Sequence, residues 1–564
     1  MITAAVFITL MMSVVLGFAW VSRAKLERFL FYVSGYFLGG DVQSRVAIGS
    51  PVSADTLMTV DGDLVTYLKI RGARRLIGPR DFDGMAERLA DHIRIMLTDG
   101  TGRQHAVTMG YLSDPPGTQN IIRELLKSAV ATARRMGASK NAKVWFDERE
   151  KFLGALCNDE TVIMAIYTLK SGLSPKESER YAQWMTTARD KVNKDAAEKK
   201  LDGAALVKAG DAADRLFNQA IIPVYPVLSS RHQAVVTNFI ASIENADGGI
   251  SIIVDKLDCG EAVYCLRRFV DGAGVPPNWR PQMFGQHAPI GSVLARSGDM
   301  AHVMPIPLAR QIFSEPMREV FEGFEMVERE GIWYGSLKLD LCPSETPAQP
   351  FSSLVDRVGK SFPFAVTFEI SPNGLDFKKM DQLFANFFGG FGSHNKALRD
   401  AWKELNDYQA QGGYNAALRM VCTTWGRNAE ALGDQIATLK MALQSWGGTT
   451  VSNESGAPAN MMIATAPTLS RYNPAPFLPG PLPTFTRMAP VYRPASPWEQ
   501  GQLVLRTAQG KPYPVAFGST IQAFWGTLVF APPGRGKSFL MNCLNAGLLF
   551  SPGLTDLPYI TIID

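Results

Sequence analysis

Apolar and polar positions follow regular spacings after residue 40, and these spacings predict secondary structure. Two apolar runs, residues 57–60 and 64–70, flank an Asp-Gly pair, which is typical of a tight β-hairpin. Apolar residues then recur at every third or fourth position over residues 82–96, which predicts a helix, and residues 105–112 read as a strand. This order of elements indicates a small α+β unit.

Similar patterns recur nearer to residue 450. Residues 364–370 alternate between apolar and other side chains, as a strand with one buried face does, and residues 418–424 predict another strand. A helical stripe over residues 427–446 ends at Gly447-Gly448. Residues 117–220 are mostly helical by pattern. We therefore expect residues 41–450 to form a mixed α/β region of two subdomains that serves in assembly.

The first 22 residues carry no charged side chain. A helix of this length spans about 33 Å, enough for the hydrocarbon core of a bilayer. Arg23, Lys25 and Arg28 follow directly, which predicts a single-pass transmembrane anchor at residues 1–22 with the rest of the chain on the cytoplasmic side. A cleaved signal peptide and a buried helix are the alternatives, and the signal peptide lacks its basic start. Residues 23–40 would be a juxtamembrane segment.

Composition narrows the possible partners and the compartment. The net charge is +4 over 564 residues and no long basic run occurs, so the composition gives no support for nucleic-acid binding. The six cysteines form no Cys-x-x-Cys pair and have no histidine at zinc-ligand spacing. They fit reduced thiols in a cytosolic compartment. The length allows three or four domains.

A proline-rich segment covers residues 451–498. Ten of the 35 prolines lie between Pro458 and Pro497, which disfavours regular structure and predicts a linker at a domain boundary. Such a segment is either a spacer or a strap on the surface of another domain. Its aromatic residues favour the strap: Phe477, Phe485, Tyr492 and Trp498.

The segment after this linker has the form of a phosphate-binding P-loop. Residues 527–530 read as a buried strand and residues 539–550 as a helix, which gives the strand, loop and helix order that the motif requires. In such a loop, backbone N–H groups surround phosphate oxygens, Lys537 neutralises β- and γ-phosphate charge, and Ser538 holds Mg²⁺. The predicted binding residues for ATP are Ala531, Pro532, Pro533, Gly534, Arg535, Gly536, Lys537, Ser538 and Phe539. Ala531 stands where the motif usually has glycine.

We expect residues 499–564 to be the beginning of a P-loop ATPase domain that opens with a hairpin at residues 503–506 and 515–517. Only 26 residues follow Ser538. Residues 559–563 predict a buried strand that ends at Asp564, whereas hydrolysis also needs a second acidic group and a residue that orients water. Catalytic residues therefore stay unassigned, and we expect this chain by itself to bind ATP without hydrolysing it.

This organisation resembles the type IV secretion and conjugation ATPases. The amino-terminal segment and the sequence from Val515 to Ser538 further resemble the DotO (IcmB) family of type IVB Dot/Icm systems. The resemblance implies an α/β fold with a RecA-like motor domain, a hexamer at the bacterial inner membrane, and contacts with other secretion subunits and ATPases. It also implies that ATP drives assembly or substrate export. Gly534, Gly536, Lys537 and Ser538 match the phosphate-binding positions of the family.

Two other functions stay open. A Pro-Pro-Gly-x-Gly-Lys-Ser loop also occurs in AAA+ proteins, so a membrane-tethered AAA+ unfoldase would fit, although the His-Glu-x-x-His segment of the related proteases does not occur in this sequence. The third hypothesis is a platform for assembling a membrane complex, in which nucleotide is a structural or switching ligand.

Overall fold

The structure is a computed structural model of the chain. It describes residues 42–561 with gaps, and the gaps are residues 75–77, 99–103, 199–224, 245–251, 284–306, 322, 344–345, 348, 379–392, 522–525, 527, 531 and 557.

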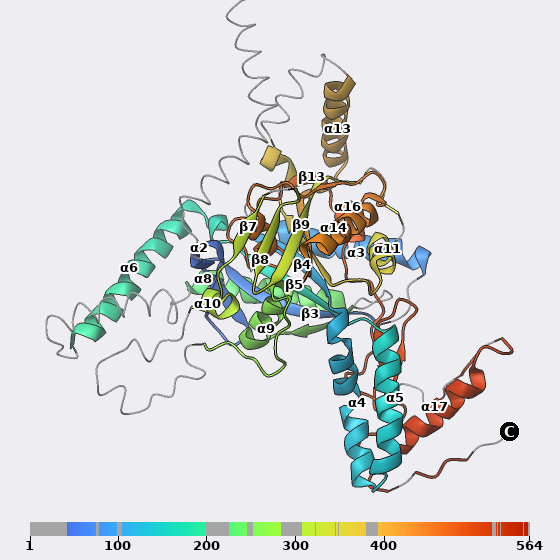
Figure 1. Cartoon of the computed structure of the whole chain (residues 1–564). Coiled ribbons are helices and arrows are strands. Elements are labelled where there is room, and N and C mark those ends of the chain that lie inside the picture. The colour runs from blue at the N-terminus through green and yellow to red at the C-terminus, as the bar shows by residue number, and fades with distance from the viewer. Residues whose placement is uncertain are drawn as a thin grey trace, which may run out of the picture.

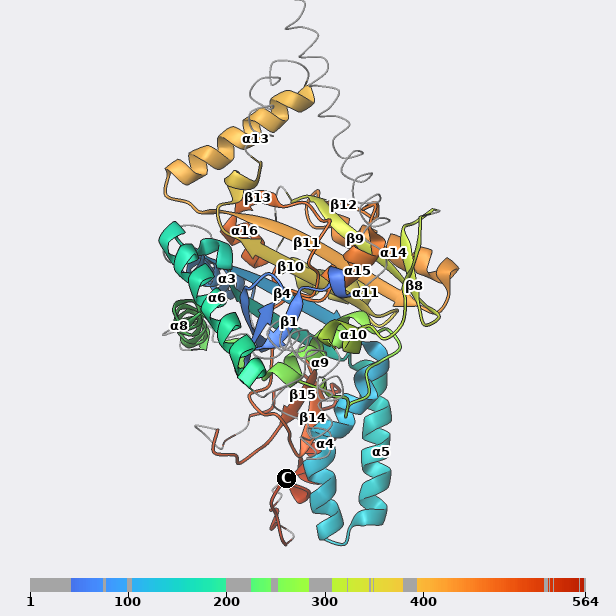
Figure 2. The same cartoon turned by 90° about the vertical axis from the view of Figure 1, so that its left-hand side faces the viewer.

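One large antiparallel sheet forms the centre of the molecule (Figures 1 and 2). Within the described residues its strands run in the order β1-β2-β3-β5-β4-β10-β11-β9-β8-β7, while β6 pairs with β3, β12 with β9 and β13 with β11. The strands are β1 (Ile48–Pro51), β2 (Thr56–Thr59), β3 (Leu64–Ala73), β4 (His105–Ser113), β5 (Glu160–Thr168), β6 (Ile252–Lys256), β7 (Arg318–Val320), β8 (Met326–Arg329), β9 (Ile332–Leu341), β10 (Phe364–Ser371), β11 (Asn415–Gly426), β12 (Thr450–Ser452) and β13 (Leu478–Pro481).

Helices cover both faces of the sheet, so each central strand is buried on both sides. One core cluster joins the sheet to α3 (Pro79–Thr98), α8 (Pro226–Glu244), α11 (Pro350–Val358), α14 (Ala429–Gln444) and α16 (Leu482–Arg487). A second core cluster joins the opposite face to α9 (Cys259–Val270), α10 (Leu308–Ile312) and α15 (Pro458–Ala464). The remaining labelled helices are α2 (Val42–Arg45), α4 (Thr118–Arg135), α5 (Ser139–Leu156), α6 (Pro175–Glu198), α13 (Ser393–Ala410) and α17 (Lys537–Leu549).

The sheet consists of two halves with the same order of elements. In the first half β2, β3, α3, β4, β5, α8, β6 and α9 follow one another, with helical insertions, and in the second half β8, β9, α11, β10, β11, α14, β12 and α15 do so. The central strands β4 and β10 pair antiparallel, and from this pair the strand order reads β5-β3-β2 on one side and β11-β9-β8 on the other. The arrangement is a pseudo-twofold repeat, and the two halves share one continuous core cluster.

Most of the short-range predictions are confirmed. The predicted hairpin is β2 and β3, and Gly62 in its turn has φ +93°, a conformation that favours glycine. The predicted helix at residues 82–96 is part of α3, and the alternating segment at residues 364–370 lies in β10. Asn428 begins α14, since its side-chain oxygen accepts a hydrogen bond from the backbone N–H of Glu430 at 2.8 Å.

The structure corrects the predicted fold class at the amino-terminal end. Among the described residues, no helix is both long and apolar enough to cross a membrane. These helices are amphipathic instead: α3 and α4 bury an apolar stripe against the protein and carry charged side chains on the other face. The described helices thus give no support to the predicted transmembrane helix, and residues 1–22 and 23–40 themselves lie outside the described residues.

The proline-rich segment is not a linker. Its residues 478–481 form β13, which pairs with β11, and α16 packs on α3. The backbone N–H of Ala73 donates to the carbonyl of Arg493 at 3.0 Å. The side chains of Phe485 and Tyr492 are buried. Prolines prevent long regular elements, but the apolar side chains between them fill the surface of the sheet domain. The strap alternative is the one that the structure shows, and it binds the two halves together.

Candidate nucleotide-binding site

The predicted phosphate-binding loop lies directly before α17. Gly534 has φ +73° and Gly536 has φ +77°, and a Cβ at either position would meet no atom within 4 Å. Glycine is therefore required here by the left-handed backbone and not by lack of space. The N–H of Arg535 donates to the carbonyl of Pro532 at 3.3 Å, which closes the turn. The two glycines of the motif thus shape the loop, as the sequence predicts.

The loop ends at the N-terminus of a helix that has no side-chain cap. Gly536 is the N-cap residue and provides no capping side chain, and its carbonyl accepts the first helical bond from the N–H of Leu540 at 2.9 Å. The first N–H groups of a helix have no intrahelical acceptor, so those of Lys537, Ser538 and Phe539 are available to an anion. Residues 532–538 are all exposed. The geometry is suited to phosphate oxygens.

The charges around the loop favour an anionic ligand. Residues 532–555 contain Arg535 and Lys537 and no acidic residue. The partial positive charge of the helix N-terminus adds to these two side chains. Among the described residues, no group of three or more His, Cys, Asp or Glu side chains could hold a metal ion. A Mg²⁺ ion would accordingly be held by Ser538 together with the phosphate oxygens of the ligand, as the motif implies.

The strands predicted on either side of α17 are wrong for the residues that the structure describes. Residues 528–530 are not in a strand, and the side chains of Leu528 and Phe530 are 81% and 87% exposed. Tyr559, in the other predicted strand, is fully exposed. A strand needs a neighbour for its N–H and C=O groups, and among the described residues no strand lies beside either segment. Ala531 and Asp564 lie outside the described residues.

Helix α17 is fixed to the rest of the chain at its C-terminal end. Helices α4 and α5 project from the sheet domain as a hairpin, and α17 lies beside them (Figure 1). The ring of Phe550 packs against Phe146 and Trp145 with centroid distances of 5.6 and 6.2 Å. Arg135 donates to the carbonyl of Leu554 at 3.4 Å. The sequence carried no signal for this contact, since it joins segments about 400 positions apart.

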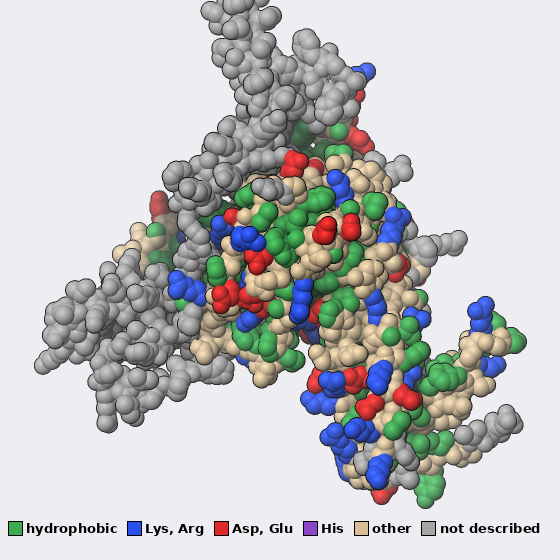
Figure 3. Space-filling view, viewed as in Figure 1, with side chains coloured by type: hydrophobic (Ala, Val, Ile, Leu, Met, Phe, Trp, Pro, Cys, Tyr) green, Lys and Arg blue, Asp and Glu red, His purple; other side chains and the backbone are tan. Residues whose placement is uncertain are grey.

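A two-stranded hairpin completes this attachment. It consists of β14 (Leu503–Arg506) and β15 (Pro512–Val515), so the first predicted strand is confirmed and the second is displaced towards the turn. Gly547 of α17 lies against Gln502 and Leu503, and Arg149 of α5 donates to the carbonyl of Val504 at 2.7 Å. Exposed lysine and arginine side chains gather toward the free end of the α4–α5 hairpin (Figure 3). Contacts with the β14–β15 hairpin and with the α4–α5 hairpin together connect α17 to the sheet domain.

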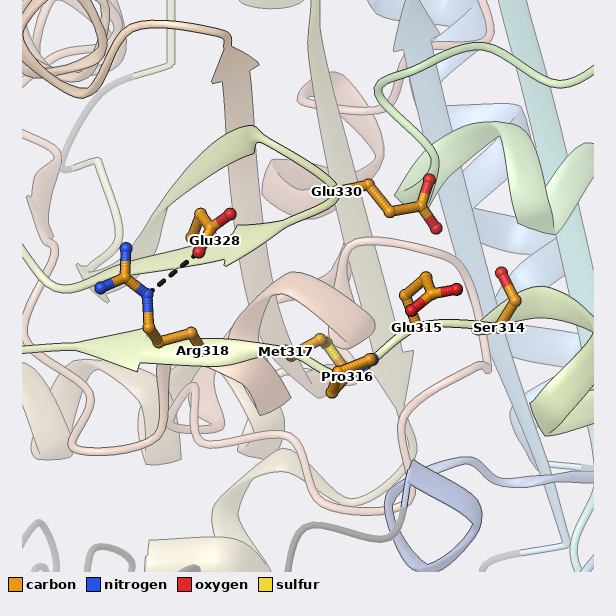
Figure 4. Close-up of a pocket in the computed structure, with 7 residues that line it drawn as sticks. All are labelled: Ser314, Glu315, Pro316, Met317, Arg318, Glu328 and Glu330. Carbon is orange, nitrogen blue, oxygen red and sulfur yellow. Dashed lines mark hydrogen bonds and ion pairs between the residues drawn. The ribbon is translucent and has the colours of Figure 1, made fainter.

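A hollow of about 710 Å³ lies at a distance from the loop, next to β7 and β8 (Figure 4). Its lining includes three carboxylates, Glu315, Glu328 and Glu330, and one cation, Arg318, which is hydrogen-bonded to Glu328 at 3.0 Å. Excess negative charge repels phosphate groups. This hollow is therefore no candidate for the nucleotide.

No protein-family model matches the chain, and no curated protein is significantly similar to it. The functional assignment therefore rests on the loop and on its surroundings.

Proposed function

We propose that this protein binds ATP with Mg²⁺ at residues 532–539. The observation that carries the proposal is the pair of left-handed glycines, Gly534 and Gly536, immediately before a helix that begins with Lys537 and Ser538. The free backbone N–H groups at the start of this helix, and the positive charge of Lys537 in its first turn, support binding of phosphate. A solvated glycine-rich turn without a ligand would need neither the lysine nor the uncapped helix end.

The proposed activity is that of an ATPase of the type IV secretion class, which uses ATP to energise assembly or export in a membrane complex of the bacterial inner membrane. Its support is the resemblance in sequence organisation and the attachment of α17 to the α4–α5 hairpin. This hairpin gives movement of the nucleotide-binding helix a route to the large sheet domain. Other secretion subunits, and further copies of this chain in a hexamer, are the partners that this function implies.

Binding is tested by titrating the full chain with a fluorescent ATP analogue in the presence of Mg²⁺. We expect Lys537→Ala to weaken binding by about tenfold to a hundredfold, since it removes a charge-assisted hydrogen bond to phosphate. Lys403→Ala on the exposed side of α13 is the matched control and should bind as the wild type does. Equal affinities of the two variants would refute the loop assignment.

A platform that uses nucleotide only as a structural ligand is the second candidate. The observation that favours it is the size of the antiparallel sheet domain. Among the described residues of this domain, no group of three or more His, Cys, Asp or Glu side chains could hold a metal ion. The two functions differ in turnover. Binding of ATP without release of phosphate by the full-length protein would favour the platform, whereas turnover that Lys537→Ala abolishes would favour the motor.

A further inference from the structure

A cavity of about 560 Å³ lies at the base of the α4–α5 hairpin. Its lining comes from the start of α4, the end of α9 and the loop that follows it, residues 361–363 directly before β10, and the end of β11. The volume falls within the range of about 300–1,000 Å³ that is usual for sites of small ligands. The residues that the argument uses are Asp114, Gly117, Asp159, Tyr264, Arg268 and Trp425.

Two carboxylates share one guanidinium group in this cavity. Arg268 donates to Asp159 Oδ2 at 2.5 Å, and the same nitrogen lies 3.6 Å from Asp114 Oδ2. A Cβ at Gly117 would lie 2.8 Å from each of these two carboxylate oxygens, so glycine lets both acids border on one point. Among the described residues, Arg268 is the cation that forms an ion pair with either acid. The lining as a whole carries an excess of negative charge, since it contains four acidic side chains (Asp114, Glu124, Asp159 and Asp271) and two arginines (Arg268 and Arg427).

The carboxylate of Asp159 has a position for one more donor. The residue is 3% exposed, and its Oδ1 atom accepts no hydrogen bond from any described residue. Its backbone is held on both sides: its N–H donates to Thr118 Oγ1 at 3.0 Å, and its carbonyl accepts from the N–H of Asp114 at 2.9 Å. Burial raises the pKa of Asp159, although Arg268 acts to lower it. A buried carboxylate with too few donors is unfavourable, and a cation held beside Asp114 and Asp159 reduces this cost through its charge.

The walls of the cavity suit the stem and the head of an organic cation. Trp425 presents an aromatic ring, and Phe362 and Ile332 add apolar surface. Tyr264 also lines the cavity, and the guanidinium group of Arg280 already lies over its ring at 5.1 Å from the centroid. Aromatic faces attract ammonium and guanidinium groups, and apolar walls accept the methylene groups that carry them. A bare metal ion is a poorer fit, because no group of three ligating side chains occurs here among the described residues.

We propose that this cavity binds an alkyl guanidinium or alkyl ammonium group between Asp114 and Asp159, with its carbon stem against Trp425. The chemistry has two possible sources: an arginine or lysine side chain of a partner protein, or a free polyamine. The site is separate from the phosphate-binding loop and does not depend on nucleotide binding.

The test is calorimetric titration of the full chain with three probes: Nα-acetylarginine amide, its neutral isostere Nα-acetylcitrulline amide, and spermidine. We expect saturable binding of the arginine or the spermidine probe and none of the citrulline probe. Preference for the arginine probe assigns the site to a protein side chain, and preference for spermidine assigns it to a free polyamine. Asp114→Asn should weaken the preferred probe by about tenfold, the effect of one charge-assisted hydrogen bond.

Asp147→Asn, at an exposed position of α5, is the matched control and should leave binding unchanged. The side chain of Asp114 is partly exposed, so Asp114→Asn should fold, and thermal unfolding of the variant checks this. The proposal is overturned if neither cation binds below about 10 mM, a dissociation constant that corresponds to negligible affinity. Equal binding of the citrulline probe, or equal binding by folded Asp114→Asn, would overturn it as well.

Discussion

The buried side chain of His232 should make the fold sensitive to mild acid. His232 lies on α8, is 1% exposed, and joins that helix to the sheet. Its Nε2 atom lies 2.8 Å from Thr66 Oγ1, and its Nδ1 atom lies 2.8 Å from Thr168 Oγ1. Burial, with a smaller contribution from His105, lowers the pKa of His232 to about 3, and Asp55 acts in the opposite direction. The folded protein therefore holds this imidazole neutral.

The sign and size of the effect follow from the difference between the folded and unfolded states. An unfolded histidine titrates at 6.5, so below that pH the unfolded chain binds a proton that the folded protein does not. Stability is unaffected above pH 6.5 and falls as the pH drops towards 3. At pH 4.5 the expected loss from this one group is about 3 kcal/mol, from RT ln(1 + 10²) with RT of about 0.6 kcal/mol.

The measurement is the free energy of unfolding of the full chain in urea at pH 7 and at pH 4.5. His232→Gln loses some stability at both pH values, because the glutamine side chain replaces the imidazole imperfectly. Its loss between the two pH values should nevertheless be smaller than that of the wild type by about 3 kcal/mol. His92→Gln, on the partly exposed surface of α3, serves as the control. If wild type and His232→Gln lose the same stability on acidification, the reasoning about the buried imidazole is refuted.

Two further predictions concern contacts made by the strap and by α17. Arg493→Ala leaves the carboxylate of Glu160, which is 1% exposed and hydrogen-bonded to Arg493 at 2.5 Å, buried without its partner, and should destabilise the protein by about 3–5 kcal/mol in urea unfolding. The double variant Glu160→Gln with Arg493→Met should recover part of this loss; no recovery would contradict the account. Phe550→Ala should increase hydrogen exchange in α17 and leave exchange in β10 unchanged, whereas equal exchange in α17 would show that the ring does not hold the helix.

Local features of this protein could be predicted because neighbouring residues determine them. Gly62 and its turn, the apolar stripe of α3 and the alternation in β10 each reflect spacing within a single element. The same holds for the predicted phosphate-binding loop, since Gly534 and Gly536 take the left-handed conformation that glycine permits without strain. Motif and element could therefore be located within a few residues.

Apolar runs were harder to interpret, because their burial depends on which other segment packs against them. The composition of the run does not specify that segment. Residues 528–530 have the composition of a core strand, yet Leu528 and Phe530 are exposed, as no strand among the described residues lies beside them. Residues 478–481, rich in proline and glycine, pair with β11 in the large sheet. From composition, residues 528–530 were predicted to form a strand and residues 478–481 to lie in a linker, and the structure shows the opposite in both. Composition reflects the strand propensity of a segment but not whether a neighbouring strand is available to pair with it.

The sequence by itself determined the local elements, the glycine-containing loop at residues 532–538 and the charge of that loop. Only the tertiary structure decided the pseudo-twofold pairing of β4 with β10, the strap across the sheet, and the attachment of α17 to α4 and α5. It also brought Asp114, Asp159 and Arg268 together from three separate elements. The physical reason is that spacing within an element fixes which face is apolar, whereas the partner of that face is chosen by packing among residues that lie far apart along the chain.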